Sequence, residues 1–376
     1  MGELQNFLKE CRLALNRWKT LQEIHIVIGN ESCDLDSMVS SLAYGFLLFK
    51  TLNMEYSKDK AVFPVLNVPR SQFHLRLEHC YLLNKVGIKL ETLIFRPELN
   101  FEEIIEHFSL SNKSIKTYLV DHHVTVDNED ILNETVCKIF DHRPVVENHC
   151  WTKENVQMRI NHVGSCSTII GDEIFTKGED IWNKDLAYLI YSTIVLDTKG
   201  LKMQNKATAL DVEVASKLEI KFNFCERNSL YGKLMNLHCE ISHLSPYEML
   251  IKDLKCTGAV AFPRICILAR NFMSLHGGLD ALYDLCLERK SIIAVIIGSD
   301  QNSHEKKDIG VLFKTNNVGY IQEFVQKFKQ FGLQESPTQL SNFFIFNFKD
   351  KKMTRKEIVP IIMKVYTDCK HQMFTN

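Results

Sequence analysis

The feature that most constrains the fold is an alternation of short apolar runs with helical patterns between about residues 24 and 200. The runs IHIVIG, AVFPVL, TLIF and KTYLV predict strands, and MVSSLAYGFLLF, between the first two, predicts a helix. Strands that alternate with helices predict an α/β fold whose parallel sheet is covered on both faces. Ligands of such sheets bind beyond the carboxyl ends of the strands, so polar residues directly after an apolar run are the first candidates for a site.

A second α/β unit follows a looser, polar stretch. Its apolar runs are GAVAFPRICIL, SIIAVIIG, DIGVLFKT and FFIFNF, and its helical patterns are GLDALYDLCLERK, IQEFVQKFKQF and TRKEIVPIIMKVYTD. With 376 residues, the chain is too long for one comfortable core. We therefore predict a first domain over residues 1–215, a linker over 216–240 and a smaller second domain over 241–376.

Composition narrows the partners and the compartment. The formal net charge is -1, which argues against nucleic acid or an anionic membrane as the main partner. No run approaches the roughly 20 apolar residues of a membrane span. The 12 cysteines form no CxxC pair or compact framework, which indicates a reduced intracellular protein. The amphipathic start carries acidic residues, so we expect a cytoplasmic protein, with a mitochondrial fraction left open.

Acidic and histidine residues gather after the apolar runs of the first domain. They are Asp34 and Asp36, then Asp121 with His122 and His123, then Asp141 with His142 and Arg143, and finally Asp197. One aspartate after a strand is usually a helix cap or a turn residue. Several carboxylates at one edge of a sheet would repel one another, and two divalent cations would balance four of them. The spacing Asp-x-Asp suits one carboxylate for each of two metals roughly 3.5–4 Å apart.

The ordered motifs NxxxDxD, LVDHH, DHR, GSCST and LD resemble those of the DHH phosphoesterase superfamily. The phrases GNESCDLDS, PVLNVPRS and VGSCSTII are similar to its Prune and exopolyphosphatase branch. The resemblance covers nearly the whole chain. It implies an N-terminal parallel-sheet DHH domain, followed by a smaller DHHA2-type α/β domain with a mixed sheet.

The resemblance also implies the metal ligands. Asp34 would bind one metal and Asp36 the other, Asp121 would bridge them, and His142 and Asp197 would complete the second site. We expect two divalent ions, Mn2+ or Mg2+. By its position, the string DHH at 121–123 matches the family's second motif, in which only the aspartate is an expected ligand. His122 and His123 contact either the metal site or only the surrounding structure.

Two positions depart from the pattern of most family members. Asn30 stands where most of them have a metal-binding histidine, so we expect a weak ligand there and better competition by Mg2+. Arg143 replaces the second histidine of the eponymous motif, and a guanidinium can clamp phosphate through two hydrogen bonds. Arg143 cannot act as a titrating acid. Asp121, His142 and Arg143 are the expected catalytic residues.

Basic residues are expected to hold the substrate. By the resemblance, Lys255 in KDLK and the pair Arg355 and Lys356 in TRKE bind phosphate. Without the resemblance, TRKE is an ordinary capped helix start, with Thr354 and Glu357 as a capping box.

Two further segments have two readings each. Arg70 and Arg76 in NVPRSQFHLR either hold phosphates or are solvated surface charges. Residues 164–168 either offer backbone amides to phosphate at a helix start or pack that helix closely.

The residues and the resemblance together predict a metal-dependent hydrolase of phosphoanhydride bonds, with pyrophosphate or short inorganic polyphosphate as substrate. A cyclic-nucleotide phosphodiesterase acting on cAMP remains an alternative, and so does a signalling scaffold of low activity with protein partners. Because the sequence ends at Asn376, we expect no long partner-binding tail like that of animal Prune proteins. A nuclease is disfavoured, since the GGGH motif of the nucleic-acid branch has no match here.

Overall fold

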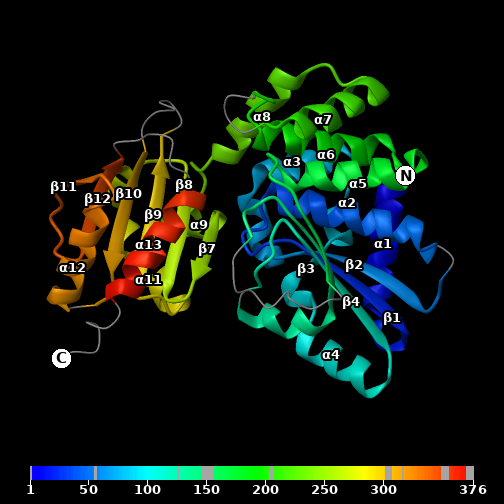
Figure 1. Cartoon of the computed structure of the whole chain (residues 1–376), viewed down its shortest axis with the longest axis horizontal. Helices are drawn as coiled ribbons and strands as arrows, with labels where there is room; N and C mark the ends of the chain where they lie inside the picture. Colours follow the sequence, from blue (N-terminus) through cyan, green and yellow to red (C-terminus); the bar gives the residue numbers. More distant parts are fainter. Residues whose placement is uncertain are drawn as a thin grey trace. The chain divides into compact units, whose positions relative to one another are not determined.

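The computed structural model describes residues 2–54, 57–125, 127–145, 156–202, 207–300, 307–315, 317–348 and 355–369. The chain divides into two compact units, Met1–His238 and Cys239–Asn376, which are drawn in Figure 1. Residues 216–238, within the expected linker, belong to the first unit. The α/β class is confirmed, with a parallel sheet in the first unit and a mixed sheet in the second.

The first unit is built on a six-stranded parallel sheet in the order β3-β2-β1-β4-β5-β6. Because the chain adds β2 and β3 on one side of β1 and then returns to add β4 on the other, β1 and β4 lie side by side. Their carboxyl ends form the topological switch point, the preferred ligand site of such sheets. The strands are β1 (Glu23–Ile28), β2 (Lys60–Leu66), β3 (Ile94–Phe95), β4 (Ser114–Val120), β5 (Val136–Asp141) and β6 (Gln157–Ile160).

Helices cover both faces of this sheet. In Figure 1, α2, α5 and α6 lie above the strands and α4 lies below them. Both faces of β1 are buried, since each of its last five residues is inaccessible to solvent. The helices are α1 (Glu3–Leu15), α2 (Leu35–Thr51), α3 (Leu77–Lys85), α4 (Phe101–Leu110), α5 (Cys166–Lys177), α6 (Lys184–Asp197), α7 (Ala209–Phe222) and α8 (Arg227–Cys239).

The apolar run AYLIYSTIVL before Asp197 is a helix, α6, and not a strand. The side chain of Asn183 caps its first turn by accepting a hydrogen bond from the amide of Leu186. Nine of its 14 residues are buried, all of them between Leu186 and Val195, so the apolar run belongs to a buried helix. Asp197 is therefore the last residue of a helix.

The second unit has a six-stranded mixed sheet in the order β11-β12-β10-β9-β8-β7. Only β8 and β9 pair in parallel, and the other neighbours pair antiparallel. The strands are β7 (Leu254–Thr257), β8 (Val260–Ile265), β9 (Ile293–Ser299), β10 (Lys307–Phe313), β11 (Leu333–Ser336) and β12 (Phe343–Phe348). The helices are α9 (Pro246–Lys252), α10 (Ala269–Met273), α11 (Gly278–Glu288), α12 (Val318–Lys329) and α13 (Arg355–Cys369).

The core of the second unit lies between the sheet and helices α12 and α13. Phe324 of α12 and Ile362 of α13 are fully buried against the sheet residues Val295 and Phe313. Helix α13 continues through Pro360. Among the described residues, no helix combines the length and the apolar character needed to cross a bilayer.

Candidate metal centre

The loop after β1 brings the first acidic residues to the switch point. Asp34 is the N-cap of α2, and its side chain accepts a hydrogen bond of 3.0 Å from the amide of Ser37. The helix starts so close to the strand that a Cβ on Gly29 would lie 2.7 Å from Cβ of Ser37. The cap interpretation thus holds for Asp34, while Asp36 lies in the first turn and is only 4% exposed.

Two buried side chains hold this loop through hydrogen bonds to its backbone. Arg76 donates to the carbonyl of Ser32 at 2.7 Å, and His79 donates to the carbonyl of Cys33 at 3.0 Å. Arg76 is 2% exposed, so it is not a solvated surface charge. Its role in the described structure is to hold the loop that carries the two aspartates.

Asp36 accepts hydrogen bonds from the start of α5. Its two carboxylate oxygens take the amide of Cys166 at 2.6 Å and the amide and hydroxyl of Ser167, both at 2.7 Å. A helix N-terminus stabilises a negative charge, which is here a side chain of the protein itself. These two amides are used within the fold.

Gly164 explains why α5 comes so near. A Cβ at this position would lie 2.5 Å from Cγ2 of Thr198 and 3.0 Å from Oδ2 of Asp211. The amide of Gly164 donates to the same Asp211 oxygen at 2.8 Å. Of the two readings of residues 164–168, the contacts therefore favour close packing of the helix.

Asp121 follows β4 directly and is fully buried. Its φ of 59° places a residue other than glycine in the left-handed region, a strained conformation that turns its side chain toward the loop after β1. Oδ2 accepts hydrogen bonds from Nδ2 of Asn30 at 2.6 Å and from the hydroxyl of Ser37 at 2.7 Å. Both donors hold the carboxylate in place.

Asn30 lies beside the acidic group as a hydrogen-bond donor. Its amide nitrogen contacts Asp121, and its Oδ1 accepts from the amide and the hydroxyl of Ser32 at 3.0 and 2.7 Å. An asparagine binds a metal through the oxygen, which Ser32 engages here. The structure thus gives Asn30 contacts that orient Asp121.

His142 completes the group from the turn after β5. Its Nδ1 donates to the carbonyl of Val163 at 3.1 Å, which leaves the lone pair on Nε2. Nε2 lies 3.4 Å from Oδ1 of Asp121. The side chains of Asp36, Asp121 and His142 each offer one ligand atom, and these atoms lie within 4.8 Å of one another.

Arg143 is the positive charge at this group. Its Nη1 lies 2.9 Å from Oδ1 of Asp121 and 3.0 Å from Oδ1 of Asp141, and it also donates to the carbonyl of Asp121. Burial lowers the pKa of Arg143, but the two carboxylates outweigh it and raise that pKa. The guanidinium thus contacts two buried carboxylates, those of Asp121 and Asp141.

The remaining negative charge is visible in the pKa of Asp36, which burial and the neighbouring Asp121 raise above its ordinary value. Two carboxylates and one imidazole Nε2 are oxygen and nitrogen donors of the kind that divalent cations bind. The donors present therefore fit a divalent metal ion at the carboxyl ends of β1 and β4.

Asp141 and the two histidines after Asp121 serve the local structure. Asp141 accepts from Nδ1 of His123 at 2.5 Å and from the amide of His142 at 2.7 Å, so it fixes the turn that carries His142. His122 contacts the carbonyl of Val120 at 3.0 Å and lies 3.8 Å from Glu129. In both cases the contacts favour the structural alternative.

The other expected ligands lie outside the group of three. Asp34 uses one oxygen as the cap of α2, and Asp197 ends α6 with a half-buried side chain. Neither belongs to the set of ligand atoms within 4.8 Å of one another in the part of the chain that the structure describes.

Arg70 has its donors engaged elsewhere. It donates to Glu98 at 2.8 Å and to the carbonyls of Leu90 and Leu93 at 2.7 and 2.8 Å. Its guanidinium also lies 4.4 Å from the ring centre of Phe95. These contacts tie residues 90–98 to the segment after β2, and they do not bring Arg70 to the acidic group.

In the second unit, three of the cations gather at one carboxylate. Arg355 donates to Oδ1 of Asp253 at 2.8 Å and to its carbonyl at 3.0 Å, and Arg264 lies 3.6 Å from Oδ2. Burial raises the pKa of Asp253, but Arg355, Arg264 and Lys255 lower it well below its usual range. Sequence reasoning missed Arg264 and Asp253, although Asp253 is part of KDLK. The side chain of Lys356, like Thr354, lies outside the described residues.

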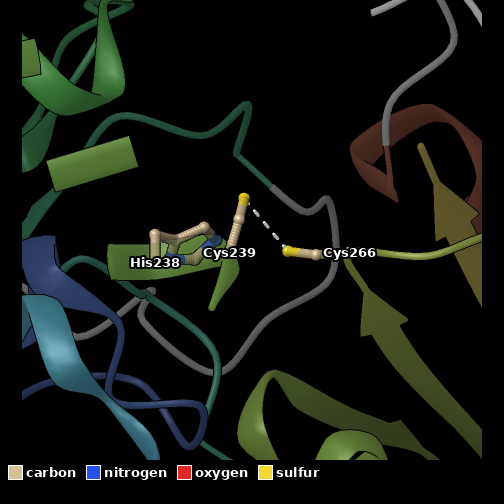
Figure 2. Close-up of side chains that lie close together, drawn as sticks. All are labelled: His238, Cys239 and Cys266. Carbon is tan, nitrogen blue, oxygen red and sulfur yellow. Dashed lines mark hydrogen bonds between the residues drawn. The ribbon is translucent and has the colours of Figure 1, made fainter. Parts of the chain in front are cut away.

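A pair of thiols lies elsewhere in the second unit. Figure 2 shows Cys239 and Cys266 pointing toward each other, with a hydrogen bond of 3.2 Å between their sulfur atoms. His238 precedes Cys239 in the chain. The cysteines in the described residues are free thiols.

Comparisons with known proteins agree with this geometry. No protein family model matches the sequence. A crystal structure described as a putative family II inorganic pyrophosphatase of Methanococcus jannaschii superposes with a TM-score of 0.61, 19% identity and coverage of 91% of this chain and 99% of that one. The chain thus has the fold of a family II pyrophosphatase, the DHH type.

Proteins that are similar in sequence indicate the family to which the chain belongs. Exopolyphosphatase PRUNE1 of Homo sapiens is 35% identical over 254 residues, which are 67% of this chain and 53% of that protein. A putative exopolyphosphatase of Schizosaccharomyces pombe is 24% identical over 368 residues, 90% of this chain and 89% of that one. The chain spans about half the length of the PRUNE1 protein that it matches. It belongs to the Prune and exopolyphosphatase branch of the DHH phosphoesterase superfamily.

Proposed function

We propose that this chain is a metal-dependent hydrolase that cleaves the phosphoanhydride bonds of inorganic pyrophosphate or short polyphosphates. The observation that carries the proposal is the buried group of Asp36, Asp121 and His142 at the switch point of the sheet. Its relatives are named exopolyphosphatases, and its fold is that of a family II pyrophosphatase.

The proposed ligands are Asp36, Asp121 and His142, with Asp34 and Asp197 completing a site for two ions, Mn2+ or Mg2+. Bound divalent cations lower the pKa of a water molecule and neutralise phosphate oxygens. Asn30 and Ser37 would keep Asp121 oriented through their hydrogen bonds of 2.6 and 2.7 Å. The amides of Cys166 and Ser167 would do the same for Asp36.

Arg143 has two possible partners in this proposal. In the described structure its guanidinium neutralises part of the charge of Asp121 and Asp141. Once cations balance these carboxylates, the guanidinium is available to a substrate phosphate, to which it can donate two hydrogen bonds. An arginine holds its proton at any physiological pH, so Arg143 would bind phosphate without acting as an acid.

The cations around Asp253 form the proposed phosphate-binding surface of the second unit, which we interpret as a DHHA2-type domain. Lys255, Arg264 and Arg355 bring three positive charges to one carboxylate, so the cluster keeps an excess of positive charge. Lys356 is included on the basis of its motif alone. Arg70 is left out because Glu98 and two carbonyls engage its donors.

A substrate panel tests the proposal. The purified chain would be assayed for phosphate release from pyrophosphate, tripolyphosphate, tetraphosphate and long polyphosphate, and for hydrolysis of cAMP, with Mn2+, Mg2+ or a chelator. We expect metal-dependent release from the inorganic substrates. Hydrolysis of cAMP without phosphate release would favour the phosphodiesterase alternative, and no turnover with any substrate would favour a scaffold.

A further inference from the structure

The first unit contains a cavity that is separate from the metal centre. Its volume is about 470 Å³, and strands β1, β4 and β5 and helices α2 and α5 line it. Binding sites for small organic molecules have volumes of about 300–1,000 Å³. The cavity is therefore large enough for a ligand of that kind.

Helices α2 and α5 and strand β4 each run between the cavity and the metal centre. At the N-termini of the two helices, Asp36 contacts the amides of Cys166 and Ser167. At their C-terminal ends, Thr51 and Lys177 line the cavity. At 1.5 Å per residue, the stretch of α2 from Asp36 spans about 12 Å to Tyr44 and about 22 Å to Thr51, and both of these residues line the cavity. A ligand in the cavity would thus lie about 12–22 Å from Asp36 along α2, and Asp36 itself does not line the cavity.

The walls of the cavity are largely apolar. Leu47 and Leu48 of α2 and the rings of Tyr44 and Tyr118 face it, together with His25 of β1. Burial lowers the pKa of His25 to about 4, so the imidazole is uncharged at neutral pH. These groups suit the apolar or aromatic body of a ligand.

Two tyrosine side chains, those of Tyr44 and Tyr118, line the cavity. Tyr44 is 4% exposed. The hydroxyl of Tyr118, in the same wall, contacts Nδ1 of His25 at 2.9 Å. A tyrosine hydroxyl in the wall can donate a hydrogen bond to a polar ligand atom.

The charged groups of the cavity are mainly positive. Its lining residues include three lysines, Lys116, Lys138 and Lys177, and one acid, Glu173. The carboxylate of Glu173 forms ion pairs with Lys138 at 2.8 Å and with Arg159 at 2.7 Å.

The other two lysines leave an excess of positive charge at the cavity. Lys116 shares Glu23 with Lys60, at 2.6 and 2.8 Å. Lys177 is exposed at the end of α5 and forms no ion pair within the described residues. The edge of the cavity therefore carries more positive than negative charge, which attracts an anionic group.

We propose that this cavity binds a small organic anion with an apolar or aromatic body. The body would lie against Leu48, Tyr44 and Tyr118, and its anionic group, a carboxylate, sulfonate or phosphate ester, would face Lys177 and the hydroxyl of Tyr44. The site is distinct from the metal centre and does not depend on the proposed hydrolase activity.

Calorimetric titration of the full chain with the aromatic sulfonate 8-anilinonaphthalene-1-sulfonate tests this proposal. The test variants are Thr51→Trp, which places an indole at the cavity, and Lys177→Glu, which reverses its uncompensated charge. Thr51 is exposed and its hydroxyl bonds only to carbonyls of its own helix, the nearer at 2.8 Å, so we expect the variant to fold. The matched controls are Ile220→Trp and Lys184→Glu, both at exposed helix positions outside the cavity.

We expect one dye per chain, loss of that binding in Thr51→Trp, and a weakening of about fivefold or more in Lys177→Glu from the reversed charge. Both controls should bind as the unchanged chain does. Absence of stoichiometric binding, or equal binding by Lys177→Glu and Lys184→Glu, would overturn the proposal.

A competition experiment separates this site from the metal centre. Excess tripolyphosphate and the substitution Asp121→Asn should leave dye binding unchanged, because neither the substrate site nor Asp121 lines the cavity. Displacement of the dye by tripolyphosphate would show that it binds at the phosphate site, and the cavity proposal would then fail whether or not the chain is a hydrolase.

Discussion

Replacing Gly164 by alanine should weaken both the fold and the metal centre. The added Cβ would lie 2.5 Å from Cγ2 of Thr198 and 3.0 Å from Oδ2 of Asp211, closer than such atoms pack. Something must move, and Asp211 is also held by Thr208 at 2.7 Å and by the hydroxyl of Thr168 at 2.6 Å. Overpacking a buried site costs about 1–3 kcal/mol. For a unit of this size, each kcal/mol lowers the melting temperature by about 2–4 °C, so we expect a loss of about 2–12 °C.

The change should also reach Asp36. Gly164 lies two residues before Cys166, whose amide donates to Asp36 at 2.6 Å, so a displaced start of α5 would loosen that carboxylate. The assay is a calorimetric melting curve together with metal-dependent phosphate release well below the melting temperature. Gly232→Ala is the control, because a Cβ there meets nothing within 4 Å in helix α8 and should add about 0.5–1 kcal/mol of stability. If Gly164→Ala melted like Gly232→Ala, the close-packing argument would be refuted.

Three further predictions follow from other parts of the molecule. Mn2+ at about 100 times its dissociation constant should add about 2.7 kcal/mol to the free energy of unfolding and raise the melting temperature by about 5–11 °C. We expect this rise in the surface control Asp59→Asn and not in Asp121→Asn. Equal rises in the two variants would contradict the ligand assignment. Burial raises the pKa of Glu23, but Lys116 and Lys60 bring it to about 2, below the ordinary 4.5. The contribution of Glu23 to the free energy of unfolding is therefore full above pH 4.5 and lost as the pH falls toward 2. In urea denaturation, Glu23→Gln should lower the free energy of unfolding by about 1 kcal/mol or less near neutral pH, and this loss should disappear in acid. A loss that persists near pH 2 would contradict this. Hydrogen peroxide should oxidise the thiols of Cys239 and Cys266, whose sulfur atoms lie 3.2 Å apart, to one disulfide, and the peroxide is reduced to two water molecules. Peptide mass spectrometry should detect this disulfide in the unchanged chain and not in Cys239→Ser. Failure of this pair to link before the other cysteines would count against the prediction.

The strand ends were the part of the site that the sequence could predict. Asp36 and Asp121 follow apolar runs that became β1 and β4, and parallel strands bring their carboxyl ends to one edge. His142 follows β5 in the same way. For these residues the pattern of apolar runs carried the positional information. The short strands β6, β7 and β11 were missed, because four polar or mixed residues give no clear alternation.

The hydrogen bonds that hold the site could not be read from the sequence. The contact of Asp36 with the amide of Cys166 joins residues 130 positions apart, and it depends on a backbone group that every residue has. The hydrogen bond of Arg70 with Glu98 could not be predicted either, because the local sequence around an arginine is the same whether its side chain binds phosphate or pairs with a carboxylate of the protein. The cluster at Asp253 was missed in part because Arg264 belongs to the neighbouring strand β8.

The most direct test of the central claim is phosphate release from tripolyphosphate by Asp121→Asn, with Mn2+ or Mg2+, beside the surface control Asp59→Asn. The amide keeps the shape of the buried side chain and removes its charge. The account predicts that Asp121→Asn loses about 100-fold or more of the rate, equivalent to about 2.7 kcal/mol of barrier, while Asp59→Asn retains it. Equal, metal-dependent release by the two variants would contradict the assignment of Asp121 to the metal centre.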